Sequence, residues 1–166
     1  MAVTNLSIAP LTANGFAAYG EVIETEGRDH YPINAGMAER YSDLAKVDVA
    51  ARGGRPLISL CRAQPVSLPL RLRVMERHPL SSQAFVPLSR SPFLIVVAPA
   101  GKTLRSEDIR AFRSNGRQGI NYRAGTWHHP LLALNEMTEF LIVDRGGGGE
   151  NREEIPVDDR GIVVTS

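Results

Sequence analysis

Short apolar segments, some alternating with polar residues and some continuous, recur through the middle of the chain and are separated by proline and glycine. Residues 70–77 begin with leucine and valine alternating with arginine, which gives a strand one buried and one solvated face. Residues 57–63, 84–87 and 93–98 are compact apolar runs bounded by turn-forming residues. Runs of about four to eight residues with such flanks are typical of β-strands, so we expect these segments to form a sheet.

Two short helices are expected outside this central region. Thr12 can cap the first, which ends at residues 19–20 and buries Phe16. The second is expected from Ser106 through Phe112, and the acidic residues in its first turn favour a helix start there.

The remaining segments complete a mainly β pattern. Further strands are expected at residues 21–24, 118–122 and 139–143, with an edge strand at 162–164 near the end of the chain. Residues 26–42 are rich in polar and turn-forming residues and are expected to form a loop. Many short strands, few helices and frequent turns favour an all-β barrel or sandwich.

The composition is that of a globular protein with one domain, spanning residues 1–166. Basic residues number 19 and acidic residues 18, a net charge of +1, so no basic surface suggests a nucleic-acid partner. The longest apolar run, residues 93–98, is too short to span a bilayer, and no membrane association is expected. Cys61 is the only cysteine, which excludes an internal disulfide and fits a reducing cytoplasm.

Candidate chemistry gathers in two segments that are distant in the sequence. Glu76, His78 and Gln83 stand at positions i, i+2 and i+7, so a strand followed by a short turn can bring them to one face. Gly125 precedes His128 by three residues, which predicts a tight turn that delivers this imidazole. A carboxylate, two imidazoles and a carboxamide would then converge inside one β-structure. We expect the function to reside there.

The spacing of these residues resembles the two motifs of the cupin superfamily, H-x-H-x4-E and P-x-G-x2-H. Here the first motif reads Glu76-x-His78-x4-Gln83, and the second covers residues 123–128. The spacing is kept, while two of the four ligand identities differ. Over nearly its full length, the chain resembles the ureidoglycolate lyase (ureidoglycolate hydrolase) family of the allantoin degradation pathway. The blocks that carry this resemblance are Phe16–Gly20, Glu39–Tyr41, Arg62–Pro65, Glu76–Leu80, Gln83–Phe85, Trp127–Pro130 and Asp144–Gly147.

The resemblance implies a mainly β, cupin-type barrel that cleaves (S)-ureidoglycolate to glyoxylate and urea in purine degradation. Glu76, His78 and His128 are the expected catalytic residues. An imidazole can act as the base because it titrates near neutrality, and which group does so stays open. The same three residues could hold one divalent metal, with nickel the first candidate and a metal-free site the alternative.

Four residues are expected to bind the substrate. Gln83 offers both amide donors and an acceptor. Arg62, at the end of an apolar strand, is preferred over other arginines for a bidentate contact with the substrate carboxylate. Asn121 and Tyr122 precede the second motif and are expected to line the site. His129 is expected to point away from it, because adjacent residues on extended backbone face opposite ways.

Other functions and the assembly state stay open at this point. The chain could be a metal-dependent cupin isomerase or dioxygenase acting on another small hydroxy acid, and a dioxygenase would need iron. It could also be a non-catalytic cupin that binds a small metabolite. A homodimer is expected from the resemblance and because exposed sheet edges are usually paired or covered. The N-terminal segment and residues 162–164 could form its interface, unless the tail completes its own barrel.

Overall fold

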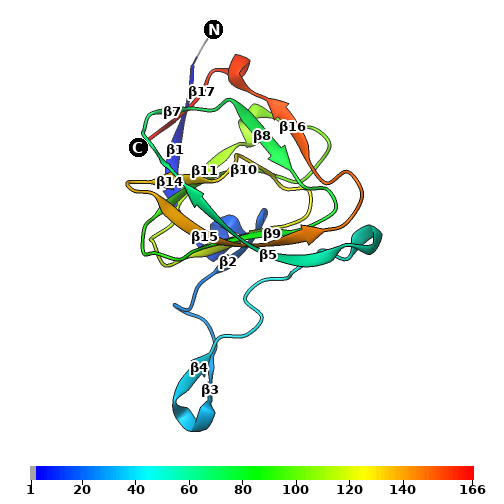
Figure 1. The fold of residues 1–166 in the computed structure, drawn as a ribbon. Coiled ribbons are helices and arrows are strands. Elements are labelled where there is room, and N and C mark those ends of the chain that lie inside the picture. Colours follow the sequence, from blue (N-terminus) through cyan, green and yellow to red (C-terminus); the bar gives the residue numbers. More distant parts are fainter. Residues whose placement is uncertain (1–2) are drawn as a thin grey trace.

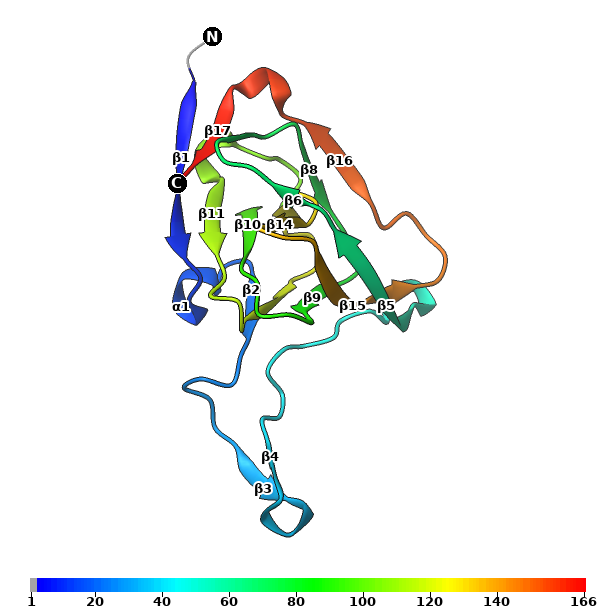
Figure 2. The same cartoon turned by 60° about the vertical axis from the view of Figure 1, so that its left-hand side comes forward.

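The computed structural model describes residues 3–166 and is mainly β. Two curled sheets face each other around the core, and a thin hairpin arm projects from this body (Figures 1 and 2). One α-helix, α1 (Ala13–Phe16), occurs among residues 3–166. No helix in this range is long and apolar enough to cross a membrane. Turns of 3-10 helix lie at Asn34–Gly36, Ala51–Gly53, Ser106–Asp108 and Asp158–Arg160.

The larger sheet has the order β16-β8-β13-β10-β11-β1-β17-β7, and β14 pairs with β10 and with the short β6. Its strands are β1 (Thr4–Pro10), β6 (Pro65–Val66), β7 (Leu70–Arg71), β8 (Val74–Arg77), β10 (Phe93–Ala98), β11 (Arg110–Arg113), β13 (Trp127–His128), β14 (Leu132–Leu134), β16 (Glu153–Pro156) and β17 (Ile162–Thr165).

The smaller sheet has the order β2-β12-β9-β15-β5 and ends in two edge strands, β2 and β5. Its strands are β2 (Gly20–Ile23), β5 (Arg55–Ala63), β9 (Gln83–Pro87), β12 (Gly119–Tyr122) and β15 (Thr138–Gly146). The arm consists of β3 (Tyr31–Ile33) and β4 (Ala38–Arg40), which pair only with each other among the described strands and extend away from both sheets (Figure 2).

Strand β10 separates two apolar clusters, because both of its faces are buried. Ile95 packs in the cluster between the two sheets, together with aromatic side chains from each. Its neighbour Val96 packs with Trp127 in the cluster on the other side of the larger sheet. This double burial explains why residues 93–98 are continuously apolar instead of alternating. The mainly β prediction is confirmed, and the curled sheets agree with a cupin-type fold.

The predicted helix from Ser106 through Phe112 is wrong. Only residues 106–108 form a helical turn, and β11 follows directly. Ala111 and Phe112 pair with β10 on one side and with β1 on the other, so tertiary pairing satisfies their backbone groups. Acidic residues at the start of a helix contribute less free energy than this two-sided burial, and the strand prevails.

Three other expectations are corrected by the strand pairing. The segment 70–77 is not one strand, because it breaks between β7 and β8. The loop predicted at residues 26–42 contains the hairpin arm. The tail at residues 162–164 is not at an edge: β17 lies between β1, which runs parallel to it, and β7, which runs antiparallel. The tail therefore completes its own sheet.

Candidate active site

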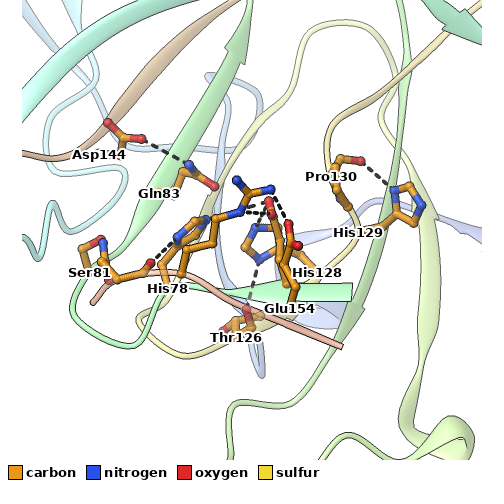
Figure 3. Close-up of polar contacts among 12 residues, drawn as sticks. His78, Ser81, Gln83, Thr126, His128, His129, Pro130, Asp144 and Glu154 are labelled. Carbon is orange, nitrogen blue, oxygen red and sulfur yellow. Dashed lines mark hydrogen bonds and ion pairs between the residues drawn. The ribbon is translucent and has the colours of Figure 1, made fainter. Parts of the chain in front are cut away.

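Glu76, His78 and His128 come together where β8 meets β13. Figure 3 labels the two histidines of this group. The Oε1 atom of Glu76 lies 3.4 Å from Nε2 of His128 and 3.9 Å from Nε2 of His78. Glu76 and His128 are cross-strand partners, so their side chains share a face of the sheet. One possible ligand atom from each of the three lies within 4.8 Å of the others. We call these residues the Glu-His-His cluster.

A tight turn positions His128, as the sequence suggests. The backbone N–H of Thr126 donates to the carbonyl of Arg123 at 3.0 Å, and Gly125 inside this turn has a φ of +80°, which favours glycine. The N–H of Gly125 donates to the carbonyl oxygen of His78 at 2.9 Å. The turn thus connects the two motifs directly.

In both imidazoles of the cluster, Nδ1 lies within hydrogen-bonding distance of a backbone carbonyl oxygen. The Nδ1 atom of His78 lies 2.7 Å from the carbonyl oxygen of Asn151, and that of His128 lies 3.0 Å from the carbonyl oxygen of Thr126. A carbonyl only accepts, so Nδ1 carries the proton in the neutral ring and Nε2 presents a lone pair. Both Nε2 atoms are buried, and neither has a hydrogen-bond partner among residues 3–166.

Gln83 turns its amide oxygen toward the same region. Its Nε2 donates to Oδ2 of Asp144 at 3.2 Å, and this contact fixes the orientation of the amide, because a carboxylate cannot donate. Figure 3 shows the oxygen of Gln83 pointing away from Asp144, on the side of His78. This oxygen is buried and accepts no hydrogen bond from the described part of the chain. Gln83 therefore presents an acceptor beside the cluster.

Unpartnered acceptors gathered in this way fit a bound cation. Burying polar atoms without partners costs free energy, and a proton or a metal ion between them removes that cost. Two imidazole nitrogens and one carboxylate oxygen are suitable ligands for nickel, zinc, iron or manganese. Glu76, His78 and His128 thus have the chemistry and spacing to hold a divalent metal, with the weaker amide ligand of Gln83 beside them.

The electrostatics of the cluster favour an ionised carboxylate and a neutral His78. Burial opposes ionisation of Glu76, but the neighbouring His128, with smaller contributions from His78 and Arg152, lowers the pKa of Glu76 overall. Burial is the main cause that lowers the pKa of His78, and its bond to a backbone carbonyl only partly offsets this. At neutral pH, His78 therefore remains in its basic, uncharged form.

Tyr122 supports one ring of the cluster. Its ring stacks on that of His128, with centroids 4.1 Å apart and an angle of 9° between the planes. Burial, and then the charge of Glu76, raise the pKa of Tyr122, so its hydroxyl keeps its proton. The expectation that Tyr122 lines the site agrees with this placement.

Arg152 also reaches the cluster, although it is not among the candidates that the sequence suggests. Its Nε donates to Oε2 of Glu76 at 3.2 Å, and its Nη2 pairs with Glu154. The side chain of Arg152 is 64% exposed and that of Glu76 12%, so the guanidinium lies on the solvent side of the carboxylate. The only sequence signal for Arg152 is that it closely follows the glycine run at 146–149. Arg152 reaches Glu76 because β16 pairs with β8.

Two predicted substrate-binding residues lie elsewhere. Asn121 faces the outer side of the smaller sheet, because its neighbour Tyr122 faces inward, and its Nδ2 donates to Glu21 and to the Lys46 carbonyl, both at 2.9 Å. Arg62 is exposed on β5 and forms an ion pair of 3.3 Å with Glu139, its cross-strand partner. The structure therefore does not bring Asn121 or Arg62 to the cluster.

His129 behaves as alternation predicts. Its Nδ1 lies 2.8 Å from the carbonyl oxygen of Pro130, and Figure 3 shows its ring directed away from His128. A cavity of about 500 Å³ beside β1 is also remote from the chemistry. Its lining includes Ile8, Leu68 and Arg113 but no residue of the Glu-His-His cluster.

Comparison with known proteins identifies the family of this chain. The model of a family described as ureidoglycolate lyase matches residues 3–165. A protein from Burkholderia mallei (strain NCTC 10229), named ureidoglycolate lyase, is 56% identical over 149 residues, which cover 90% of this chain and 87% of that protein. Proteins of the same name are 54% identical in Azotobacter vinelandii (strain DJ / ATCC BAA-1303), over 90% of each chain, and 53% identical in Burkholderia cepacia, over 92% of this chain and 86% of the relative.

Proposed function

Because this chain belongs to the ureidoglycolate lyase family, we propose that it cleaves ureidoglycolate to glyoxylate and urea at the Glu-His-His cluster. One observation carries the location of the site: two buried imidazole nitrogens and a carboxylate converge, and the two nitrogens have no hydrogen-bond partner among residues 3–166. Such atoms are costly to bury unless they bind something. The reaction belongs to the degradation of allantoin, as the resemblance implies.

The reaction requires two proton transfers and no water. Ureidoglycolate carries a hydroxyl, a carboxylate and a ureido group on one carbon. Loss of the hydroxyl proton forms the aldehyde carbonyl of glyoxylate as the carbon–nitrogen bond breaks, and the departing urea nitrogen takes up a proton. The site must therefore supply a proton acceptor, a proton donor and a cation or hydrogen-bond donors for the carboxylate.

The cluster can supply the proton transfers. The Nε2 lone pairs of His78 and His128 are directed to one region, and burial keeps His78 in its basic form at neutral pH. The imidazole that takes the hydroxyl proton can return it to the urea nitrogen, while Glu76 stabilises the transient imidazolium. The oxygen of Gln83 can accept an N–H of the ureido group and so orient the leaving group.

A divalent metal is the alternative occupant of the same place. Glu76, His78 and His128 would hold it, and it would lower the pKa of the substrate hydroxyl as a Lewis acid. Nickel is our first candidate, because imidazole nitrogen is a favourable ligand for it. In this form the histidines bind the ion instead of acting as the base.

Release of urea from racemic ureidoglycolate tests the function directly. We expect equal amounts of urea and glyoxylate to form, and an absence of urea would refute the proposed activity. The assay is then repeated after dialysis against a chelator and after addition of nickel, manganese, zinc or iron. Loss and recovery of turnover would establish the metal form, whereas unchanged turnover would establish the metal-free form.

We further propose that the protein forms a homodimer through the outer face of the smaller sheet. Ile58 and Leu60 on β5 are 77% and 62% exposed, and they lie side by side on an edge strand of nine residues. A long apolar edge strand is normally covered, since it otherwise leads to aggregation. Met37 at the tip of the arm is 86% exposed and adds apolar surface that a second copy could cover.

A cytoplasmic location is proposed because the single cysteine needs no oxidising compartment.

Light scattering at dilute protein concentration tests this interface. The wild-type protein should have twice the mass of the 18.1 kDa chain, and Ile58→Lys should give the single-chain mass. Val3→Lys is the comparison variant, because Val3 is also exposed but lies on the N-terminal segment, the other interface expected from the sequence. A wild-type mass of one chain would refute the dimer, and a dimer that persists in Ile58→Lys would refute this face.

A further inference from the structure

We propose that Arg152 binds the carboxylate of the substrate, an assignment that rests on the proposed lyase function. The reaction leaves this carboxylate unchanged, so its partner must be a stable cation close to the reacting carbon. A guanidinium suits the role, because it stays charged and its planar donors match the two oxygens of a carboxylate.

The contacts of Arg152 place it beside the reacting groups. Of the arginines in residues 3–166, it alone forms an ion pair with a member of the Glu-His-His cluster, through Nε and Oε2 of Glu76 at 3.2 Å. Its Nη2 pairs with Glu154, whose side chain is 45% exposed. Its Nη1 makes no hydrogen bond to any described residue. A carboxylate arriving from solvent can therefore bind Nη1 and replace Glu154 at Nη2, without disturbing the contact with Glu76.

The backbone that carries Arg152 is fixed even though its side chain is exposed. The preceding residue, Asn151, accepts a hydrogen bond from the N–H of Leu80 at 2.8 Å and donates to Oγ of Ser81 at 2.9 Å. The carbonyl oxygen of Asn151 also lies 2.7 Å from Nδ1 of His78. One segment thus orients a cluster imidazole and holds the backbone from which the Arg152 side chain extends toward Glu76, which favours binding of a substrate in one pose.

Two other arginines in the sequence blocks that carry the family resemblance have different partners. Arg77 pairs with Glu153 at 2.6 Å and lies over the ring of Trp127. Arg145 is buried and donates to the carbonyl oxygens of Ala51 and Gly148. These two guanidiniums stabilise the fold, and Arg62 is on the outer face. Arg152 is the one whose charge is both next to the cluster and open to solvent.

Binding of glycolate and of glycolamide, measured by calorimetry, tests the assignment without relying on turnover. The two molecules share the hydroxyl carbon and differ in having a carboxylate or a neutral amide. We expect the wild-type protein to prefer glycolate, and Arg152→Ala to lose about 10- to 100-fold in glycolate affinity with little change for glycolamide, as a lost charge-assisted contact predicts. Arg152→Lys should lose less, because it keeps the charge without the planar fork.

Two controls separate binding from folding. Arg105→Ala removes an arginine that is also 64% exposed and paired with a glutamate but lies outside the site, and it should leave glycolate binding unchanged. Glu154→Gln removes the competitor for the guanidinium and should leave glycolate affinity unchanged or higher. Should Arg152→Ala not fold, as judged by circular dichroism, Arg152→Lys and Glu154→Gln still provide the comparison.

The kinetics of urea release give an independent result. Arg152→Ala should raise KM for ureidoglycolate about 10- to 100-fold with a smaller change in kcat, since it removes binding that substrate and transition state share. A retained preference for glycolate over glycolamide in Arg152→Ala, or an equal loss of glycolate affinity in Glu154→Gln, would overturn the assignment. Absence of urea release by the wild-type protein would instead refute the lyase function, while the calorimetry still decides whether Arg152 binds carboxylates.

Discussion

The interior between the sheets and the outer face of the smaller sheet are built from the same strands but differ in how their polar groups are satisfied. Inside, Gln83 of β9 presents a buried oxygen without a hydrogen-bond partner in the described chain. Outside, the amide of Asn121 on β12 donates two hydrogen bonds, and Arg62 on β5 has an ion pair. Buried polar groups that lack partners indicate a binding site, whereas the side chains of Asn121 and Arg62 already have protein partners.

Whether a buried polar group has a protein partner is a better guide to function than its residue type or its proximity in the sequence. Asn121 and Tyr122 are adjacent, yet only Tyr122 contacts the cluster, because side chains alternate across a strand. The same rule separates His128 from His129. Variants on the two sides of the sheet should therefore have separable effects on turnover and on stability.

The largest expected effect is on the interior side. His128→Ala should lower kcat for urea release by about 100-fold or more if the imidazole transfers the proton or holds a metal, while the fold is retained. Asn121→Ala should lower the free energy of unfolding by about 1–3 kcal/mol, because Glu21 and the Lys46 carbonyl lose their donor, and should change kcat little. Assays of urea release and denaturant unfolding of both variants measure this contrast. Near-normal turnover in His128→Ala would contradict the expected contrast between the interior and the outer face.

A smaller effect is expected from a residue that acts through another. Asp144→Asn should weaken the binding of nickel to the metal-free protein about 10-fold or more, because an amide partner no longer fixes which atom Gln83 presents. Calorimetric titration with nickel measures this change. Glu139→Gln is the matched control, since Glu139 lies on the same strand but faces outward beside Arg62. Equal affinities in both variants would show that the orientation of Gln83 is unimportant for the ion.

The smallest effect concerns the thiol of the edge strand. Cys61 packs toward the interior, and burial raises its pKa above the usual 9.0, so little thiolate is present near neutral pH. We expect it to react with a disulfide reagent at pH 8 about 10-fold more slowly than a cysteine placed in an exposed turn, and to react faster as the pH rises. Ser89→Cys in a Cys61→Ser background is the reference. Equal rates would indicate that β5 opens or faces the other way.

Local patterns predict much of this fold. The strands at 57–63, 93–98 and 139–143 lie within or match β5, β10 and β15, because short apolar runs bounded by turn-forming residues favour strands. The turn at Gly125 follows from local chemistry as well. The helix expected at 106–112 fails, since pairing with β10 and β1 outweighs the preference of a short segment.

The sequence by itself predicted the mainly β class from its short apolar segments, and its motif blocks carried the candidate residues Glu76, His78 and His128 together with the resemblance to the family. Only the tertiary structure decided which arginine stands beside this set. Arg152 reaches Glu76 through the pairing of β16 with β8, whereas the more conspicuous Arg62 faces outward. Register between distant strands and the choice of face depend on the whole core, and a shift of one residue would exchange the two sides.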